Sequence, residues 1–178
     1  IEVQTQTRLQ TFAPDIHVLF APVKKARLDY MVQKAAEMGA ASLTPVMTQY
    51  TQKARLNYER LKANIVEAAE QCNLLHVPEL NESIDLELVL EKLSETLPSR
   101  FLVFCDEGAG PILTKDSRLA LEALKNKPVA ILIGPEGGFS PAERQKLLAR
   151  PDTLAISLGP RILRADTALV AALSLCQM

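Results

Sequence analysis

Two short apolar segments in the C-terminal half of the chain each end in a glycine-containing turn that leads into a helical pattern. The segments cover residues 130–133 and 154–158, a length that suits strands buried on both faces. The first turn reads Gly-Pro-Glu-Gly-Gly at 134–138, and the second reads Gly-Pro-Arg at 159–161. In open α/β sheets, ligands bind just beyond the carboxyl ends of the strands. The two turns therefore predict a binding site, which we interpret as a cofactor site.

The rest of the chain alternates strand-like apolar segments with amphipathic helical patterns. Further strands are expected at 16–21, 42–48 and 100–105, and helices at 28–36, 55–72, 86–93 and 118–126. This alternation predicts an α/β fold with a mainly parallel sheet and helices on both of its faces. Pro45 suggests that its strand lies near an edge or a bulge. The loop at 105–110 would join the two glycine turns at one edge of the sheet, while the strand order stays open.

The composition is that of a soluble globular protein with one main domain. Of the 178 residues, 48% are hydrophobic and 23% are charged, and no apolar run approaches the ~20 residues of a membrane helix. No secretory signal is recognisable. Cys72, Cys105 and Cys176 are far apart and lack C-x-x-C spacing, so neither a disulfide framework nor a metal site is expected. We expect a cytoplasmic protein with no membrane or metal partner.

The overall charge gives no support to a nucleic-acid-binding function. The formal net charge is −1, whereas nucleic-acid-binding domains are often strongly basic. Any RNA-binding role must therefore rest on local basic patches.

The first glycine turn does not match the common phosphate-binding loops. A Walker loop ends in Lys-Ser/Thr and a dinucleotide fold needs G-x-G-x-x-G, and residues 134–140 satisfy neither pattern. Glu136 would also bring a negative charge to a position where a polyphosphate needs donors. A ligand poor in phosphate fits better, although a simple tight turn stays an alternative. Ser140 and Glu143 then form a capping box that starts the next helix.

The second turn carries two arginines at the start of a helix. Arg161 and Arg164 oppose the helix dipole there, at a cost of some tenths of a kcal/mol each. A chain tolerates such a cost most readily where an anionic partner binds. A structural ion pair between Arg164 and a carboxylate is the alternative.

Four segments, in order and at suitable spacing, resemble the signatures of one enzyme family. They read DYMVQKAAEMGAASLTPV, EAAEQCNLLHVPEL, LIGPEGGFSPAE and LGPRILRADTA. Together they are similar to the RsmE-type ribosomal RNA methyltransferases, a branch of the SPOUT superfamily, over roughly residues 14–176. The chain departs from the family pattern at Asp166, where Glu is common. It also has Asn73-Leu74 where Gly-Arg is frequent, so we assign no RNA contact to that loop.

The resemblance implies a fold, a reaction and partners. Residues 14–178 would form a SPOUT methyltransferase domain with a C-terminal trefoil knot, a rare exception to normal chain topology. Residues 1–13 would be a remnant of an N-terminal PUA-like β-barrel or a linker. The implied enzyme is a cytoplasmic homodimer that uses S-adenosylmethionine to methylate N3 of a uridine in 16S ribosomal RNA of the small subunit.

The resemblance also implies roles for individual residues. Arg164 would stabilise the anion that develops on the uridine, and Glu136 is a weaker candidate for the proton acceptor. The expected RNA contacts are Lys24, Lys25, Lys34, Arg55 and Arg161. The expected cofactor contacts are Cys105, Ile133, Gly134, Gly137, Gly138, Leu158, Gly159, Ile162, Leu163, Arg164 and Thr167.

Three other functions stay open. A SPOUT ribose 2′-O-methyltransferase acting on rRNA or tRNA would carry an Asn/Ser-rich second signature in place of RILRADT. A non-catalytic RNA-binding protein of ribosome assembly would not need both cofactor loops. An unrelated nucleotide-binding α/β protein would bind ATP.

Overall fold

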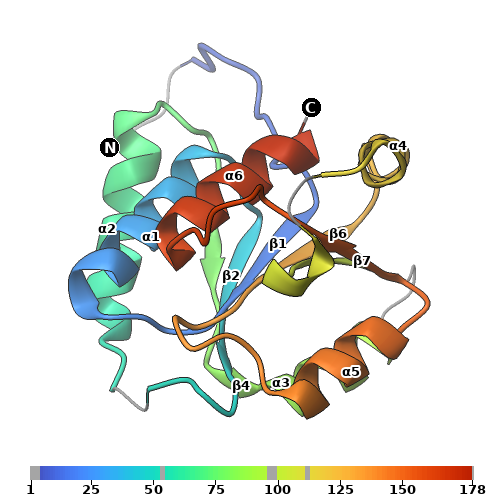
Figure 1. Cartoon of the computed structure of the whole chain (residues 1–178). Helices are drawn as coiled ribbons and strands as arrows, with labels where there is room; N and C mark the ends of the chain where they lie inside the picture. The colour runs from blue at the N-terminus through green and yellow to red at the C-terminus, as the bar shows by residue number, and fades with distance from the viewer. Residues whose placement is uncertain (1–4, 53–54, 96–99, 111–112, 178) are drawn as a thin grey trace.

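One parallel sheet forms the centre of the protein (Figure 1). The structure is a computed structural model, which describes residues 5–52, 55–95, 100–110 and 113–177. The strand order is β3-β2-β1-β6-β5-β7, with β4 also paired to β2, and each of these pairings is parallel. The predicted α/β fold with a mainly parallel sheet is therefore confirmed. The strands are β1 (Ile16–Phe20), β2 (Ser42–Met47), β3 (Glu79–Leu80), β4 (Ile84–Asp85), β5 (Phe101–Cys105), β6 (Val129–Ile133) and β7 (Thr153–Ile156).

Helices cover both faces of the sheet, as the alternating pattern predicts. Helices α1, α2 and α6 lie on one face, and α3 and α5 lie on the other (Figure 1). No helix in the described ranges is long and apolar enough to cross a membrane. The helices are α1 (Lys25–Glu37), α2 (Tyr58–Gln71), α3 (Leu86–Glu95), α4 (Lys115–Ala123), α5 (Pro141–Ala149) and α6 (Ala165–Gln177), with a short 3-10 helix η1 (Glu107–Ala109) after β5.

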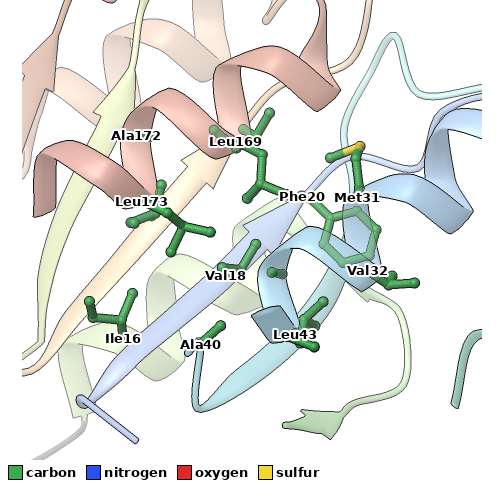
Figure 2. Close-up of a cluster of buried hydrophobic side chains, with 14 of the residues drawn as sticks. Ile16, Val18, Phe20, Met31, Val32, Ala40, Leu43, Leu169, Ala172 and Leu173 are labelled. Atoms are coloured by element: carbon green, nitrogen blue, oxygen red, sulfur yellow. The ribbon is translucent and has the colours of Figure 1, made fainter. Parts of the chain in front are cut away.

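The interior strands contribute side chains to two separate cores. On β1, Val18 and Phe20 belong to the core under α1 and α6, whereas Leu19 belongs to the core under α3 and α5. Figure 2 shows Leu169 and Leu173 of α6 directed onto β1, next to α1. Both leucines are fully buried. Because α6 begins at Ala165, shortly after the turn at 159–161, this packing restricts the position of that turn against the sheet.

Two strands and one burial pattern differ from the sequence prediction. β3 and β4 have two residues each, too few for any periodicity to reveal them. The segment at 154–158 was expected to be buried on both faces, but β7 is an edge strand in the described sheet and is half-buried up to Ala155. An edge strand has a neighbour on one side only, so fewer elements cover it.

Pro45 lies on β2, the second strand from one edge of the sheet, in agreement with its predicted place near an edge. β2 pairs with β1 on one side, and on the other side with β3 at 42–43 and with β4 at 46–47. Pro45 falls between these two short pairings. A residue without an N–H group is tolerated there because the outer ladder is interrupted at this point.

The buried face of α6 provides a test of the fold. We expect Leu169→Ala to lower the free energy of unfolding by about 2–5 kcal/mol, because the truncation leaves a cavity between α6 and β1. Ser174→Ala is the control, since Ser174 is an exposed residue of the same helix, and its effect should stay within about 0.5 kcal/mol. Urea unfolding measures both. Equal effects of the two substitutions would contradict the packing of α6.

Candidate active site

The carboxyl ends of β5, β6 and β7 lie side by side and bring three loops together. β5 is the middle strand, with Phe104 aligned to Leu132 on β6 and Cys105 aligned to Ile156 on β7. Because the three strands are parallel, the loops that follow them leave the sheet at the same edge. The predicted convergence of the three turns is therefore confirmed.

These loops enclose two adjoining cavities. The first, of about 400 Å³, lies between the loops after β5 and β7, and we call it the β5–β7 cavity. The second, of about 290 Å³, lies between the loops after β6 and β7 and reaches Arg27 of α1; we call it the β6–β7 cavity. Both volumes are of the size of small-ligand sites. The residues common to the two cavities are Cys105, Glu107, Ile162, Leu163 and Ala168.

Gly134 has no space for a side chain. An added Cβ would lie 2.5 Å from Cε2 of Phe139. The Phe139 ring packs edge-on against Phe104 of β5, with 5.1 Å between the ring centroids and an interplanar angle of 85°. Glycine at 134 therefore lets the loop after β6 fold back over the core under α3 and α5. The backbone of Gly134 then lines the β6–β7 cavity.

Gly138 and Gly159 are required for a different reason. Their φ angles are +70° and +117°, and an added Cβ at either position would meet no atom within 4 Å. Glycine is favoured at these two positions because the backbone adopts a positive φ there, and not because a side chain would lack space. Gly138 lines neither cavity.

The start of α5 is held by the predicted capping box. The Ser140 N–H donates to Glu143 Oε2 at 2.8 Å, and the Glu143 N–H donates to Ser140 Oγ at 3.3 Å. Glu143 also accepts a hydrogen bond from the Gln49 N–H at 2.8 Å. The helix that follows the β6 loop is thereby attached to the loop after β2.

Charged side chains at the cavities fall into paired and unpaired groups. Arg27 donates to the Glu136 carboxylate. In contrast, the Arg161 and Arg164 side chains are exposed and have no ion-pair or hydrogen-bond partner in the part of the chain that the structure describes. The alternative of a structural Arg164–carboxylate pair thus finds no support among these residues. Two free guanidinium groups lie where an anionic ligand or substrate can reach them.

Most of the predicted cofactor contacts line at least one cavity. Gly137, Gly138 and Thr167 line neither, although Ala168 next to Thr167 lines both. The predicted residues that do line them are Cys105, Ile133, Gly134, Leu158, Gly159, Ile162, Leu163 and Arg164, and the predicted catalytic Glu136 lines the β6–β7 cavity.

Sequence reasoning missed several lining residues. Arg27 comes from α1, and only the strand order brings it to the cavity. Pro160 lies within the predicted turn at 159–161, and Ser157 and Ala168 lie on either side of it. No recognisable sequence pattern marks any of the three as a lining residue.

The predicted RNA contacts are spread over the sheet edge and beyond it. Lys24 and Lys25 are exposed at the start of α1, and Arg55 is exposed before α2, so all three follow the carboxyl end of a strand. Lys34 is nine residues further along α1 than Lys25, about 14 Å along the helix axis. It donates to Glu37 at 2.6 Å, and this hydrogen bond raises the pKa of Lys34.

Neither a metal centre nor a reactive thiol is built into this edge. In the ranges that the structure describes, no group of three or more His, Cys, Asp or Glu side chains could hold a metal ion. Burial raises the pKa of the Cys105 thiol, so this cysteine stays protonated at neutral pH.

A model of the RNA methyltransferase domain matches residues 11–177 of the chain. Among curated relatives, the ribosomal RNA small subunit methyltransferase E of Rickettsia conorii is 30% identical over 155 residues, covering 86% of this chain and 60% of that protein. The enzyme of the same name from Bacillus subtilis is 29% identical over 157 residues, with 85% and 60% covered. The chain therefore spans less than two thirds of the length of these relatives.

Solved structures share the fold. A methyltransferase of Legionella pneumophila, determined in complex with the cofactor SAM, superposes with a TM-score of 0.78 at 30% identity over 94% of this chain and 68% of that one. The SpoU methyltransferase AviRb of Streptomyces viridochromogenes gives a TM-score of 0.60 at 18% identity, over 93% of this chain and 60% of that one. The second likeness shows the fold alone.

The contact between Gly134 and Phe139 provides a test of the β6 loop. We expect Gly134→Ala to lower the free energy of unfolding by about 1–3 kcal/mol, because the new methyl group overlaps the Phe139 ring. The same substitution in a Phe139→Ala background should cost little, since the overlapping atoms are gone. Urea unfolding of the four proteins measures the coupling. Equal costs in both backgrounds would show that Phe139 does not confine Gly134.

Proposed function

The chain belongs to the RNA methyltransferase domain family, whose model spans residues 11–177, and we propose that it uses S-adenosylmethionine to methylate N3 of a uridine in 16S ribosomal RNA. The convergence of the loops after β5, β6 and β7 on two adjoining cavities carries this proposal. Relatives named small subunit ribosomal RNA methyltransferase E support the substrate. The SAM complex of the Legionella pneumophila methyltransferase supports the cofactor.

The lining of the cavities suits a ligand with an adenosyl group. Leu158, Ile162 and Leu163 offer aliphatic surface for a flat ring, and Ile162 is 80% exposed and thus available for contact. Gly134 and Gly159 leave backbone groups accessible beside it. When bound, S-adenosylmethionine supplies a methyl group that its sulfonium has already activated. The residues of the chain therefore contribute mainly by positioning the two reactants.

Arg164 is the residue that we assign to stabilisation of charge. The neutral imide nitrogen of uridine is a poor nucleophile, so its N3 proton must leave, and negative charge then spreads to the carbonyl oxygens. A guanidinium without a partner in the described chain can meet that charge at once, because no existing ion pair must break first.

Glu136 stays the weaker candidate for the proton acceptor. Its carboxylate already forms an ion pair with Arg27. Arg27 would have to move aside before Glu136 accepts the proton. Hydroxide from solvent or a group of the RNA is the alternative acceptor.

Exposed basic residues at the same edge are the proposed phosphate contacts. Arg161 lines the β5–β7 cavity, and Lys24, Lys25 and Arg55 follow neighbouring strands. Contacts of this kind position RNA without reading its sequence. Lys34 is the weakest member of the proposed set, because Glu37 already pairs with it.

Four further features are part of the proposal. We propose a C-terminal trefoil knot, a homodimer and a cytoplasmic location, as in the family that the signatures resemble. Residues 1–13 are proposed to be the remnant of a PUA-like barrel or a linker. Leu9 and Phe12 in this segment are 78% and 87% exposed.

Arg164→Ala tests the catalytic assignment. We expect methylation of small ribosomal subunits to fall about 100-fold or more, whereas the Kd for S-adenosylmethionine changes less than about threefold, because Arg164 acts on the uridine. Nucleoside mass spectrometry detects 3-methyluridine, and calorimetry gives the Kd. Arg118→Ala on α4 is the control and should leave both values unchanged. Unimpaired methylation by Arg164→Ala would remove the proposed role.

Wild-type calorimetry separates the rival functions. Heat of binding with S-adenosylmethionine is expected, and its absence would favour a non-catalytic RNA-binding protein. Formation of a 2′-O-methylated nucleoside in place of 3-methyluridine would instead identify a ribose methyltransferase.

Cys105→Ala tests whether the thiol at the cavities takes part in the reaction. Since burial raises the pKa of the Cys105 thiol, we expect no thiolate chemistry and a methylation rate within about threefold of the wild type. The same nucleoside assay at saturating cofactor measures the rate. A loss of about 100-fold with an unchanged Kd would show that the sulfur atom is needed.

A further inference from the structure

Arg144 of α5 forms an ion pair with the carboxylate of Asp106, the first residue after β5. Arg144 Nε lies 3.2 Å from Oδ1 and 3.0 Å from Oδ2, and Nη2 lies 2.8 Å from Oδ2. The Asp106 side chain is 7% exposed, whereas that of Arg144 is 41% exposed. A carboxylate with so little access to water depends on its partner, and the fork of an arginine provides both charge and geometry.

The same carboxylate holds the turn that forms one wall of the β5–β7 cavity. The Gly108 N–H donates to Asp106 Oδ1 at 3.0 Å, inside the 3-10 helix η1. Asp106, Glu107, Gly108 and Gly110 all line the cavity. The backbone adds two hydrogen bonds, from Asp106 N–H to the Ile156 oxygen (3.0 Å) and from Ala109 N–H to the Asp106 oxygen (3.1 Å). A continuous set of contacts thus runs from α5 through Asp106 to this cavity wall.

Gly108 leaves space for the guanidinium. A Cβ at this position would lie 2.8 Å from Arg144 Nη2 and 3.0 Å from Nε. Gly108 is not among the positive-φ glycines of the described chain, so backbone conformation alone does not require glycine. Two independent features thus keep the Arg144 guanidinium in place: glycine at 108 leaves space for it, and the Asp106 carboxylate binds it.

The ion pair also joins the two cavities. Arg144 belongs to the first turn of α5, whose start is fixed by the Ser140–Glu143 capping box directly after the β6 loop. Gly134 and Pro135 of that loop line the β6–β7 cavity. The loop after β5 is therefore held at a set distance from the loop after β6.

We propose that Asp106 and Arg144 are positioning residues that hold the loop after β5 in the shape that binds the cofactor. This inference rests on the proposed function. Without the ion pair, the turn at 107–109 must be ordered when the ligand binds, and that ordering weakens the affinity. Arg164, which is assigned to charge stabilisation, lies on a different loop. The turnover rate at saturating cofactor is therefore affected much less than the Kd.

Calorimetry and turnover on the full chain test the proposal. Arg144→Gln should weaken S-adenosylmethionine binding about tenfold, while turnover at saturating cofactor changes less than about threefold. Arg144→Lys, which keeps the charge, should recover part of the affinity. Lys146→Gln is the matched control, because Lys146 lies on the same helix and pairs with Glu87 at 2.5 Å, outside the residues that line the two cavities. Its Kd should equal that of the wild type.

Gly108→Ala provides a second route that leaves both charges in place. The added methyl group should displace the guanidinium and weaken binding about as much as Arg144→Gln. In the Arg144→Gln background the same substitution should have no further effect. Equal affinities of wild type, Arg144→Gln and Gly108→Ala, each measured well below its melting temperature, would overturn the proposal and leave the ion pair a stabilising contact only.

Hydrogen exchange distinguishes a failure of this inference from a failure of the proposed function. Arg144→Gln should increase the exchange rate of the amides at 107–109, whether or not a ligand is present. A wild-type chain that does not bind S-adenosylmethionine would contradict the proposed function. Unchanged exchange at 107–109 in the variant would overturn the inference by itself.

Discussion

The parallel pairing of β5 between β6 and β7 is the constraint on which the sheet edge with the two cavities depends. Parallel strands need long crossover connections, so β5, β6 and β7 are each followed by a loop and a helix. Every such loop leaves from the same edge, and the three loops meet because their strands are neighbours. β6 is buried along its whole length, so its side chains pack into the cores on both faces of the sheet. The cavities are thus a consequence of strand order more than of any single loop.

Local patterns in the sequence predict the elements that local forces determine. The apolar segments of β1, β5 and β6 and the capping box at Ser140 are found where the pattern indicates them. The strand order and the contacts that depend on it were not predictable. Asp106 and Arg144 are 38 positions apart, and Arg27 and Glu136 are 109 apart. In the sequence, nothing distinguishes these four residues from other charged residues, because their partners are distant along the chain.

The glycines show the same distinction within one site. From sequence, all of them could be interpreted as points where the backbone approaches a ligand. The structure separates three physical reasons: Gly134 gives space to the Phe139 ring, Gly108 gives space to a guanidinium, and Gly159 adopts a positive φ. The first reason involves the Phe139 ring of the same loop and the second the Arg144 side chain of α5, and turn rules, which concern backbone conformation, include neither contact. Glycines in a signature can therefore be needed for packing within the site as well as for contact with a ligand.

The distribution of paired charges explains how a chain of net charge −1 can present unpaired guanidinium groups at the two cavities. Arg27, Lys34 and Arg144 each form an ion pair with a carboxylate of the chain. Their charges are neutralised locally and add little to the field at the sheet edge. Arg161 and Arg164 have no such partner in the described chain. Because a free guanidinium keeps all its donors for an incoming group, these two residues can meet an anionic group at the cavities even though the overall charge is slightly negative.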